Sequence, residues 1–155
     1  MRDIRTETAE LYERQADRLY RLAYARLLNA ADAEDAVAET FAKYLRKMPE
    51  FRDASHEKAW FLRVCINTCN DLARRRTVRA YTPLEELSDV LAAQEKDKSV
   101  LESVYALPEK YRMCVLLYYF EDFSVEETAK ALKISGSAVK MRLSRAREML
   151  KTVLA

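Results

Sequence analysis

Residues 123–150 read FSVEETAKALKISGSAVKMRLSRAREML, which is typical of two helices joined by a tight turn. Ser124 followed by Glu127 is a capping box that starts the first helix. The residues expected to form its buried stripe are Val125, Thr128, Ala129 and Leu132, and Ile134 plugs the turn. In the second helix, Val139, Leu143, Ala146 and Leu150 recur at helical spacing. The stretch therefore predicts a helix-turn-helix that reads DNA.

The outward face of the second helix carries groups suited to a polyanion. At about 100° per residue, Lys140, Met141, Ser144 and Arg145 project away from the buried stripe, and Arg142 and Arg147 border it. Residues 130–155 hold seven Lys or Arg against one acid, Glu148. An ordinary solvated helical hairpin is the alternative, but such surfaces usually mix charge signs more evenly.

The composition predicts an all-α protein of two small helical domains. The chain has 155 residues, 50% of them hydrophobic, with one Gly and three Pro, and its abundant Ala, Leu, Glu, Arg and Lys favour helix. No window holds the roughly 18 apolar residues that span a bilayer. The first residues lack the apolar core of a signal peptide, so we expect a cytoplasmic protein.

Helical spacing divides the chain into two domains and a linker. We expect helices over about 8–28, from Asp32 to Pro49, and from Lys58 to about Arg76, with 51–57 as a loop and Leu62, Ile66, Cys69 and Ala73 on the inner side of the third. These form a domain over 1–76. Residues 77–98 are acidic and polar and form the linker, in which Pro83 can open a short helix with Leu84, Leu87 and Leu91. The second domain, 99–155, has a helix from Pro108 through Glu121 before the helix-turn-helix.

Charge is segregated along the chain. Residues 52–79 hold seven basic and three acidic groups, 80–107 hold two basic and six acidic, and 108–155 hold nine basic and six acidic. Two positive blocks around an acidic stretch predict two nucleic-acid contacts.

Metal and catalytic sites are poorly supported. Cys65 and Cys69 lie one helical turn apart near His56 and could form a metal or redox site, but the surrounding helix is apolar and favours buried thiols. The chain has one His, no Gly-rich phosphate loop and no Ser-His-Asp set, so we expect neither an enzyme nor a cofactor, a metal or a small-molecule substrate.

Four stretches together resemble the extracytoplasmic-function group of sigma-70-type sigma factors, the promoter-specificity subunits of bacterial RNA polymerase. They are LYERQADRLY (11–20), DAEDAVAETF (32–41), AWFLRVCIN (59–67) running into DLARRR (71–76), and LPEKYR (107–112) before the helix-turn-helix. The resemblance covers nearly the whole chain. It implies binding to core RNA polymerase and promoter DNA, and control by an anti-sigma factor.

The resemblance also implies roles for individual residues. Asp32, Asp35 and Glu39 match the surface that docks on polymerase, although an acidic first turn also stabilises its own helix. The loop that captures an unstacked minus-10 base and the positions beside it match Phe51, Arg52, Trp60, Arg63 and Asn67, with Arg74, Arg75 and Arg76 for phosphates. Trp60 could instead be core, and Asn67 could serve the backbone. The minus-35 readers match Ser137, Lys140, Met141, Arg142, Ser144 and Arg145.

Two departures from the family pattern affect the turn. Lys133 occupies the position where Gly is common, and Ser135-Gly-Ser137 replaces Pro-Val-Gly. A Lys in a left-handed turn costs about 1 kcal/mol relative to Gly. The alternatives for the whole chain are a stand-alone dimeric helix-turn-helix regulator, which would bind a two-fold-symmetric site, and a helical adaptor that binds polymerase without DNA.

Overall fold

The computed structural model describes residues 3–75, 80, 82–83 and 98–154. The chain divides into two compact units, Met1–Thr82 and Pro83–Ala155. All regular secondary structure in the described residues is helical, which confirms the all-α prediction. Most of the predicted linker, including the helix expected around Leu84, Leu87 and Leu91, lies outside the described residues. No helix in the described part of the chain is both long enough and apolar enough to cross a bilayer.

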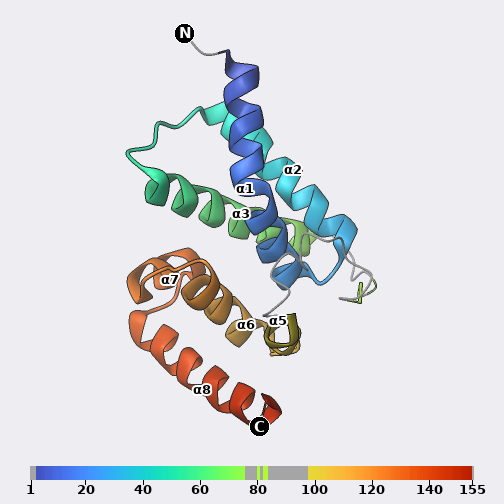
Figure 1. Ribbon diagram of the computed structural model, residues 1–155, viewed down its shortest axis with the longest axis vertical. Helices are drawn as coiled ribbons and strands as arrows, with labels where there is room; N and C mark the ends of the chain where they lie inside the picture. Colours follow the sequence, from blue (N-terminus) through green and yellow to red (C-terminus); the bar gives the residue numbers. More distant parts are fainter. Residues whose placement is uncertain (1–2, 76–79, 81, 84–97, 155) are drawn as a thin grey trace. The chain divides into compact units, whose positions relative to one another are not determined.

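The first unit is built from three helices, α1 (Ile4–Leu27), α2 (Ala30–Lys47) and α3 (Ala54–Arg75), each packed against the other two (Figure 1). The residues buried between them are Leu11, Leu19, Leu22, Ala23, Tyr24, Ala33, Ala36, Val37, Phe41, Phe61, Leu62, Cys65, Ile66 and Cys69. Of the residues predicted on the inner side of α3, Leu62, Ile66 and Cys69 are buried, and Ala73 is exposed. Ala73 lies in the last turn of α3, which ends at Arg75.

All three helices of this unit begin earlier than predicted because polar side chains cap them. Asp3 accepts a hydrogen bond from Arg5 N at 3.3 Å. Asn29 caps α2 by accepting from Asp32 N at 3.0 Å, so Asp32 is not the cap but lies inside the first turn. Asp53 accepts from His56 N at 2.8 Å, which starts α3 at Ala54 and not at Lys58.

Residues that follow α3 form hydrogen bonds with the end of α1 and with the connection from α1 to α2. Thr82 N donates to Leu28 O at 2.9 Å, and Thr82 O accepts from the Tyr24 hydroxyl at 2.6 Å. Asn29 Nδ2 donates to Ala80 O at 2.8 Å. These bonds extend the first compact unit to Thr82, past the end predicted from helical spacing.

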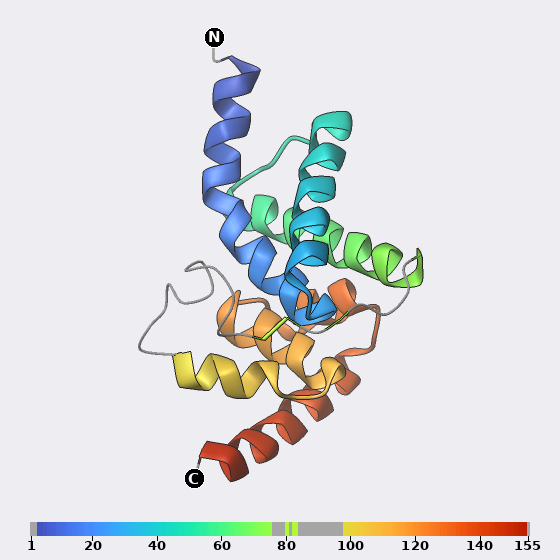
Figure 2. The same ribbon diagram turned by 90° about the vertical axis from the view of Figure 1, so that its right-hand side faces the viewer.

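The second unit contains α5 (Lys98–Tyr105), α6 (Glu109–Val115), η3 (Leu116–Phe120), α7 (Val125–Leu132) and α8 (Gly136–Leu154). Figure 2 shows α8 running out to the C terminus. The predicted capping box is present, since Ser124 Oγ accepts from Glu127 N at 3.0 Å and Glu127 Oε1 accepts from Ser124 N at 2.9 Å. Ser135 caps α8 by accepting from Ala138 N at 3.0 Å.

The helix predicted as a single α-helix from Pro108 through Glu121 changes type near its end. Residues Leu116–Phe120 form the π-helix η3, in which Glu121 N donates to Leu116 O at 3.0 Å. A π-turn holds one more residue than an α-turn, so the side chains beyond it point in directions that an α-helical wheel does not give. In this segment Tyr118 is half-buried and Tyr119 is 48% exposed.

The turn between α7 and α8 depends on a left-handed lysine. Lys133 has φ 59° and ψ 44°, as expected from its place in the turn. Gly136, the only glycine of the chain, has no positive φ. A Cβ added at Gly136 would meet Val125 Cγ1 at 3.6 Å, an ordinary contact. The residue that strains the turn is therefore Lys133, and Gly136 only begins α8.

Lys133→Gly should stabilise the second unit by about 1 kcal/mol, because a left-handed residue with a Cβ loses roughly this amount. For a domain of this size that raises Tm by about 4–8 °C, measurable by calorimetry. Lys133→Ala is the matched control, since alanine keeps the Cβ and should give no such gain. Equal Tm values for the two variants would show that the left-handed conformation carries no penalty here.

Candidate nucleic-acid interface

The outward face of α8 has the exposure that helical spacing predicted. Val139, Leu143 and Ala146 are buried at 0%, 3% and 0% exposure. The exposed residues on the other side are Ser137, Lys140, Met141, Ser144 and Arg145. This face combines cations, hydroxyls and one apolar side chain, which suit phosphates, base edges and the thymine methyl group.

Two arginines of α8 lie near titratable groups of α6 and affect the pKa of those groups. The pKa of the Tyr111 phenol is lowered, first because Arg145 donates a hydrogen bond to it and then because Lys110 adds positive charge. Burial raises the pKa of the Cys114 thiol, and the nearby Arg142 guanidinium opposes that rise. Arg142 is accordingly half-buried. Lys140 and Arg145 flank the outward face, and Arg145 interacts electrostatically with Tyr111, which the sequence pattern did not connect to it.

A third arginine of α8 is bound from the π-helix. Arg147 Nη1 donates to the Tyr119 hydroxyl oxygen at 2.8 Å. Helical spacing placed Arg147 at the border of the buried stripe but connected it to nothing. Spacing within one helix does not connect the two residues, because Tyr119 lies in η3 and Arg147 in α8.

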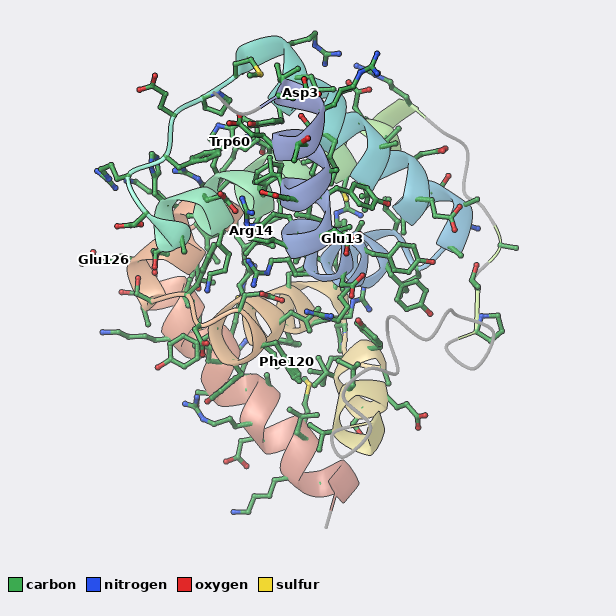
Figure 3. The ribbon with its side chains drawn as sticks, turned by 45° about the horizontal axis from the view of Figure 1, so that its top comes forward. Asp3, Glu13, Arg14, Trp60, Phe120 and Glu126 are labelled. Atoms are coloured by element: carbon green, nitrogen blue, oxygen red, sulfur yellow. The ribbon has the colours of Figure 1, made fainter. Side chains whose placement is uncertain are left out.

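In the first unit, the loop between α2 and α3 rests on an aromatic cluster formed by Tyr44, Phe51, Trp60 and Phe61. Phe51 lies nearly parallel to Tyr44, with ring centroids 6.4 Å apart and an interplanar angle of 17°. Trp60 meets Phe61 edge-on at 5.0 Å and lies 5.9 Å from Phe51. Trp60, labelled in Figure 3, is only half-buried. One side of its indole packs against the cluster, and the rest is accessible.

The predicted base-capturing residues of α3 share one helical face. Trp60, Arg63, Asn67 and Arg74 are separated by three, four and seven residues, which keeps them on one side at about 100° per residue. Arg63 is half-buried, and Asn67 and Arg74 are exposed. Arg74 forms an ion pair with Asp71 on the same face.

Of the remaining residues predicted to contact DNA in this unit, the structure describes Arg52 and Arg75. Arg75 is exposed and follows Arg74 by about 100° around the helix, and Arg76 lies outside the described residues. Arg52 is exposed, and its backbone N donates to His56 Nδ1 at 3.1 Å. That bond joins the loop to the first turn of α3.

A cavity of about 200 Å³ beside this loop is acidic and does not coincide with the predicted base site. It is lined by Glu7, Glu10, Leu11, Arg14, Tyr44, Phe51 and Glu57. Arg14, labelled in Figure 3, donates to both carboxylate oxygens of Glu57 at 3.1 Å. Only Phe51 belongs to the predicted set. Three carboxylates against one guanidinium disfavour a phosphate in this cavity.

The acidic residues predicted to dock on a partner differ in exposure. Asp35 and Glu39 are exposed on α2, and Glu39 accepts from Arg46 at 3.0 Å. Asp32 is 7% exposed, in the first turn beside the helix N-terminus. A carboxylate in the first turn interacts favourably with the helix dipole.

All three cysteines are free and buried. The Cys65 thiol donates to Leu19 O at 3.7 Å. The pKa of Cys69 is raised well above its usual value, first by a hydrogen bond with Cys65 and then by burial. In the described residues, no group of three or more His, Cys, Asp and Glu side chains is placed to hold a metal ion. These surroundings are those of small apolar core residues.

Comparisons with known proteins match both units. Residues 11–79 match the family model described as Sigma-70 region 2, and residues 98–150 match that described as Sigma-70, region 4. The RNA polymerase sigma factor SigV of Bacillus subtilis is 31% identical over 138 residues, covering 87% of this chain and 83% of SigV. The ECF RNA polymerase sigma factor SigE of Mycolicibacterium smegmatis is 31% identical over 160 residues, covering 94% of this chain and 61% of SigE.

A solved structure agrees with these sequence matches. CnrH, in complex with the cytosolic domain of CnrY, has a TM-score of 0.63 and 25% sequence identity. The similarity covers 97% of this chain and 88% of CnrH.

Proposed function

This chain belongs to the extracytoplasmic-function group of sigma-70-type RNA polymerase sigma factors, and we propose that its two units divide promoter recognition between them. It is a sigma factor that binds core polymerase and directs transcription initiation at promoters. The observation that carries the proposed division is the presence of one outward basic face in each unit, on α3 and on α8.

Within the second unit, residues 99–155 read the minus-35 element. Its base-facing residues are Ser137, Lys140, Met141 and Ser144, and Arg142 and Arg145 contact DNA from the same flank of α8.

Within the first unit, residues 1–76 capture the minus-10 element as a single strand. Phe51 and Trp60 supply aromatic surface for an unstacked base, and Arg63 and Asn67 lie on the same side of α3. Arg52, Arg74, Arg75 and Arg76 hold the phosphates of that strand. Capture of a base offsets part of the few kcal/mol of lost stacking, so melting requires no catalytic residue.

The same unit docks on core polymerase through α2. Asp35 and Glu39 are exposed and supply the contacts, while the buried Asp32 supports the helix start. The sigma factor is not itself a catalyst, and it works in the cytoplasm, where polymerase and promoter meet. The linker over 77–98 connects the two functions.

An anti-sigma factor regulates the chain. CnrH was solved with the cytosolic domain of CnrY, and a bound polypeptide of this kind would compete with polymerase for the sigma factor. A stand-alone dimeric helix-turn-helix regulator would account for α7 and α8. It would not account for the match of residues 11–79 to Sigma-70 region 2.

Run-off transcription tests the proposal. The purified chain, core RNA polymerase and a library of promoter DNAs are combined, and specific transcripts are sequenced from their 5′ ends. Transcripts that require both proteins and share upstream elements are expected. Tight binding to a two-fold-symmetric DNA site without polymerase, and no specific transcripts with it, would support the regulator instead.

Asp71→Asn should strengthen capture of the minus-10 strand. Its carboxylate lies on the proposed DNA face and pairs with Arg74 in a solvent-exposed bridge. Such pairs contribute at most about 1 kcal/mol, so we expect holoenzyme to bind a fluorescent minus-10 single strand roughly twofold to fivefold more tightly. Asp17→Asn, which removes an exposed carboxylate from α1, is the charge-matched control. Equal gains from both variants would assign the effect to net charge alone.

A further inference from the structure

Neither Tyr119 nor Arg147 is among the residues proposed to contact DNA on α3 and α8. Arg147 Nη1 donates to the Tyr119 hydroxyl oxygen at 2.8 Å, between η3 and α8. Both residues are exposed, and Tyr119 keeps 48% of its accessible surface. The pair bridges 28 residues of sequence. It joins the helix before the helix-turn-helix to the second half of α8.

Arg147 belongs to a basic edge of α8. Lys140, Arg147 and Lys151 are all exposed, and their spacing puts them within about 40° of one another around the helix. They extend over about 16 Å of helix axis. Lys140 belongs to both this edge and the base-facing set, whereas Arg147 and Lys151 adjoin the base-facing residues Met141 and Ser144 without being among them. It is therefore placed toward one wall of the groove that α8 would enter.

Glu148, the one acidic residue among residues 130–155, separates the base-facing part of α8 from the phosphate-facing part of the basic edge. Glu148 follows Met141 by seven residues and so lies on the centre of the outward face, one turn beyond Ser144. A carboxylate there repels the nucleic acid, so the base-facing part of α8 ends near Arg145. Beyond that point only the basic edge can approach a DNA strand, and phosphates are what it would meet.

We propose that Tyr119 and Arg147 together form a phosphate-binding clamp for the DNA strand that borders the minus-35 groove, an inference that rests on the proposed minus-35 role of α8. The Tyr119 oxygen accepts the hydrogen bond from Arg147 and retains its own O–H, which can donate to a phosphate oxygen. Arg147 retains its remaining N–H donors for the same phosphate. Tyr119 is thus both a positioning residue and a second donor.

The π-helix explains why such a pair can exist. In a continuous α-helix the residues after Leu116 would follow the α-helical period, whereas the π-turn of η3, which ends at Phe120 (labelled in Figure 3), changes the direction of Tyr119. The Tyr118 ring packs edge-on against Tyr119, with centroids 4.9 Å apart and an interplanar angle of 86°. The phenol is held from behind, and it holds the long Arg147 side chain before DNA arrives.

The test measures holoenzyme affinity for promoter duplex over a range of salt concentrations. Arg147→Gln should weaken binding roughly tenfold and reduce the salt slope by about 1, as expected for one lost phosphate contact. The fold loss should be the same on promoters with substituted minus-35 bases, since a phosphate contact carries no sequence information. Tyr119→Phe should weaken binding roughly twofold to fivefold, the effect of a lost hydrogen bond, with the salt slope unchanged.

Two further variants complete the design. Tyr118→Phe removes a neighbouring phenol and should leave affinity unchanged. In Tyr119→Phe with Arg147→Gln, the losses should combine to less than their product, because the two side chains act on one phosphate. An unchanged salt slope for Arg147→Gln, a loss confined to particular minus-35 bases, or wild-type affinity of Tyr119→Phe would overturn the proposal.

A separate titration tests whether the surface of Tyr119 and Arg147 binds core polymerase instead of DNA. Each variant is titrated with core polymerase in the absence of DNA, and wild-type affinity is expected. Weakened binding to core polymerase would overturn the clamp in favour of a polymerase contact at the same surface. Failure of the proposed function itself is recognised independently, because the wild-type chain would then give no promoter-specific transcripts.

Discussion

Lys140→Glu combined with Arg145→Glu is expected to lower transcription from a minus-35-dependent promoter by at least about a hundredfold. Each well-placed contact to a base edge contributes about 1–3 kcal/mol, and each phosphate contact adds its own salt-dependent attraction. Reversal removes both attractions and substitutes repulsion. Both side chains are exposed, so the fold of the second unit should survive. Run-off yield and equilibrium affinity of the holoenzyme measure the effect, with circular dichroism to verify folding.

The matched control makes the same change of net charge elsewhere. Arg5→Glu with Lys47→Glu reverses two exposed cations of the first unit, outside the face of α3 proposed to bind DNA. This control should retain transcription within about twofold, since distant surface charges are screened beyond about 10 Å. Comparable losses in both double variants would remove the assignment of α8 as the minus-35 reader.

The sequence predicted three of the four residues of the buried stripe of α8, whereas Leu150, near the C-terminal end of the helix, is only half-buried. Val139, Leu143 and Ala146 are buried and Lys140 and Arg145 are exposed, as the wheel requires. Lys133 likewise takes the left-handed conformation expected for its turn position. Elements governed by one local periodicity or one turn position are the ones that sequence reasoning recovers.

Helix starts were predicted too late for a different reason. Asp3, Asn29 and Asp53 each begin a helix through a single side-chain hydrogen bond. Asp and Asn serve caps, turns and loops alike. The apolar spacing begins only later in each helix, so these short polar signals do not by themselves mark where a helix starts. His56 shows the same ambiguity, because its ring completes the start of α3 by accepting a bond from the Arg52 backbone.

Contacts between elements remained beyond the sequence. The pairing of Arg145 with Tyr111 depends on how α6 packs against α8, and that of Arg147 with Tyr119 depends on the π-turn in η3. Neither follows from spacing within one helix. The acidic cavity is a similar case, since Glu7, Glu57 and Phe51 come from three separate segments of the first unit. A pattern can say which residues face outward, but only packing decides which of them meet.

Trp60→Ala is expected to lower promoter opening by about tenfold to a hundredfold, because stacking of a base on an aromatic side chain contributes about 1–3 kcal/mol. The indole is half-buried, with one side on Phe51, Phe61 and Tyr44. Trp60→Phe retains an aromatic face and should lose much less. Open-complex yield on a duplex promoter measures the effect, with the Tm of each variant recorded.

Loss of packing and loss of base stacking can be separated by changing the DNA instead of the protein. Promoters carrying one abasic nucleotide at successive minus-10 positions are compared with wild-type and Trp60→Ala holoenzyme. At the position whose base stacks on Trp60, the wild type should already be weakened and the substitution should add little further loss, because both changes remove the same interaction. If Trp60→Ala instead reduces opening by the same factor at every abasic position, the indole acts only as part of the aromatic cluster, and the captured base must rest against another side chain of α3 or its preceding loop.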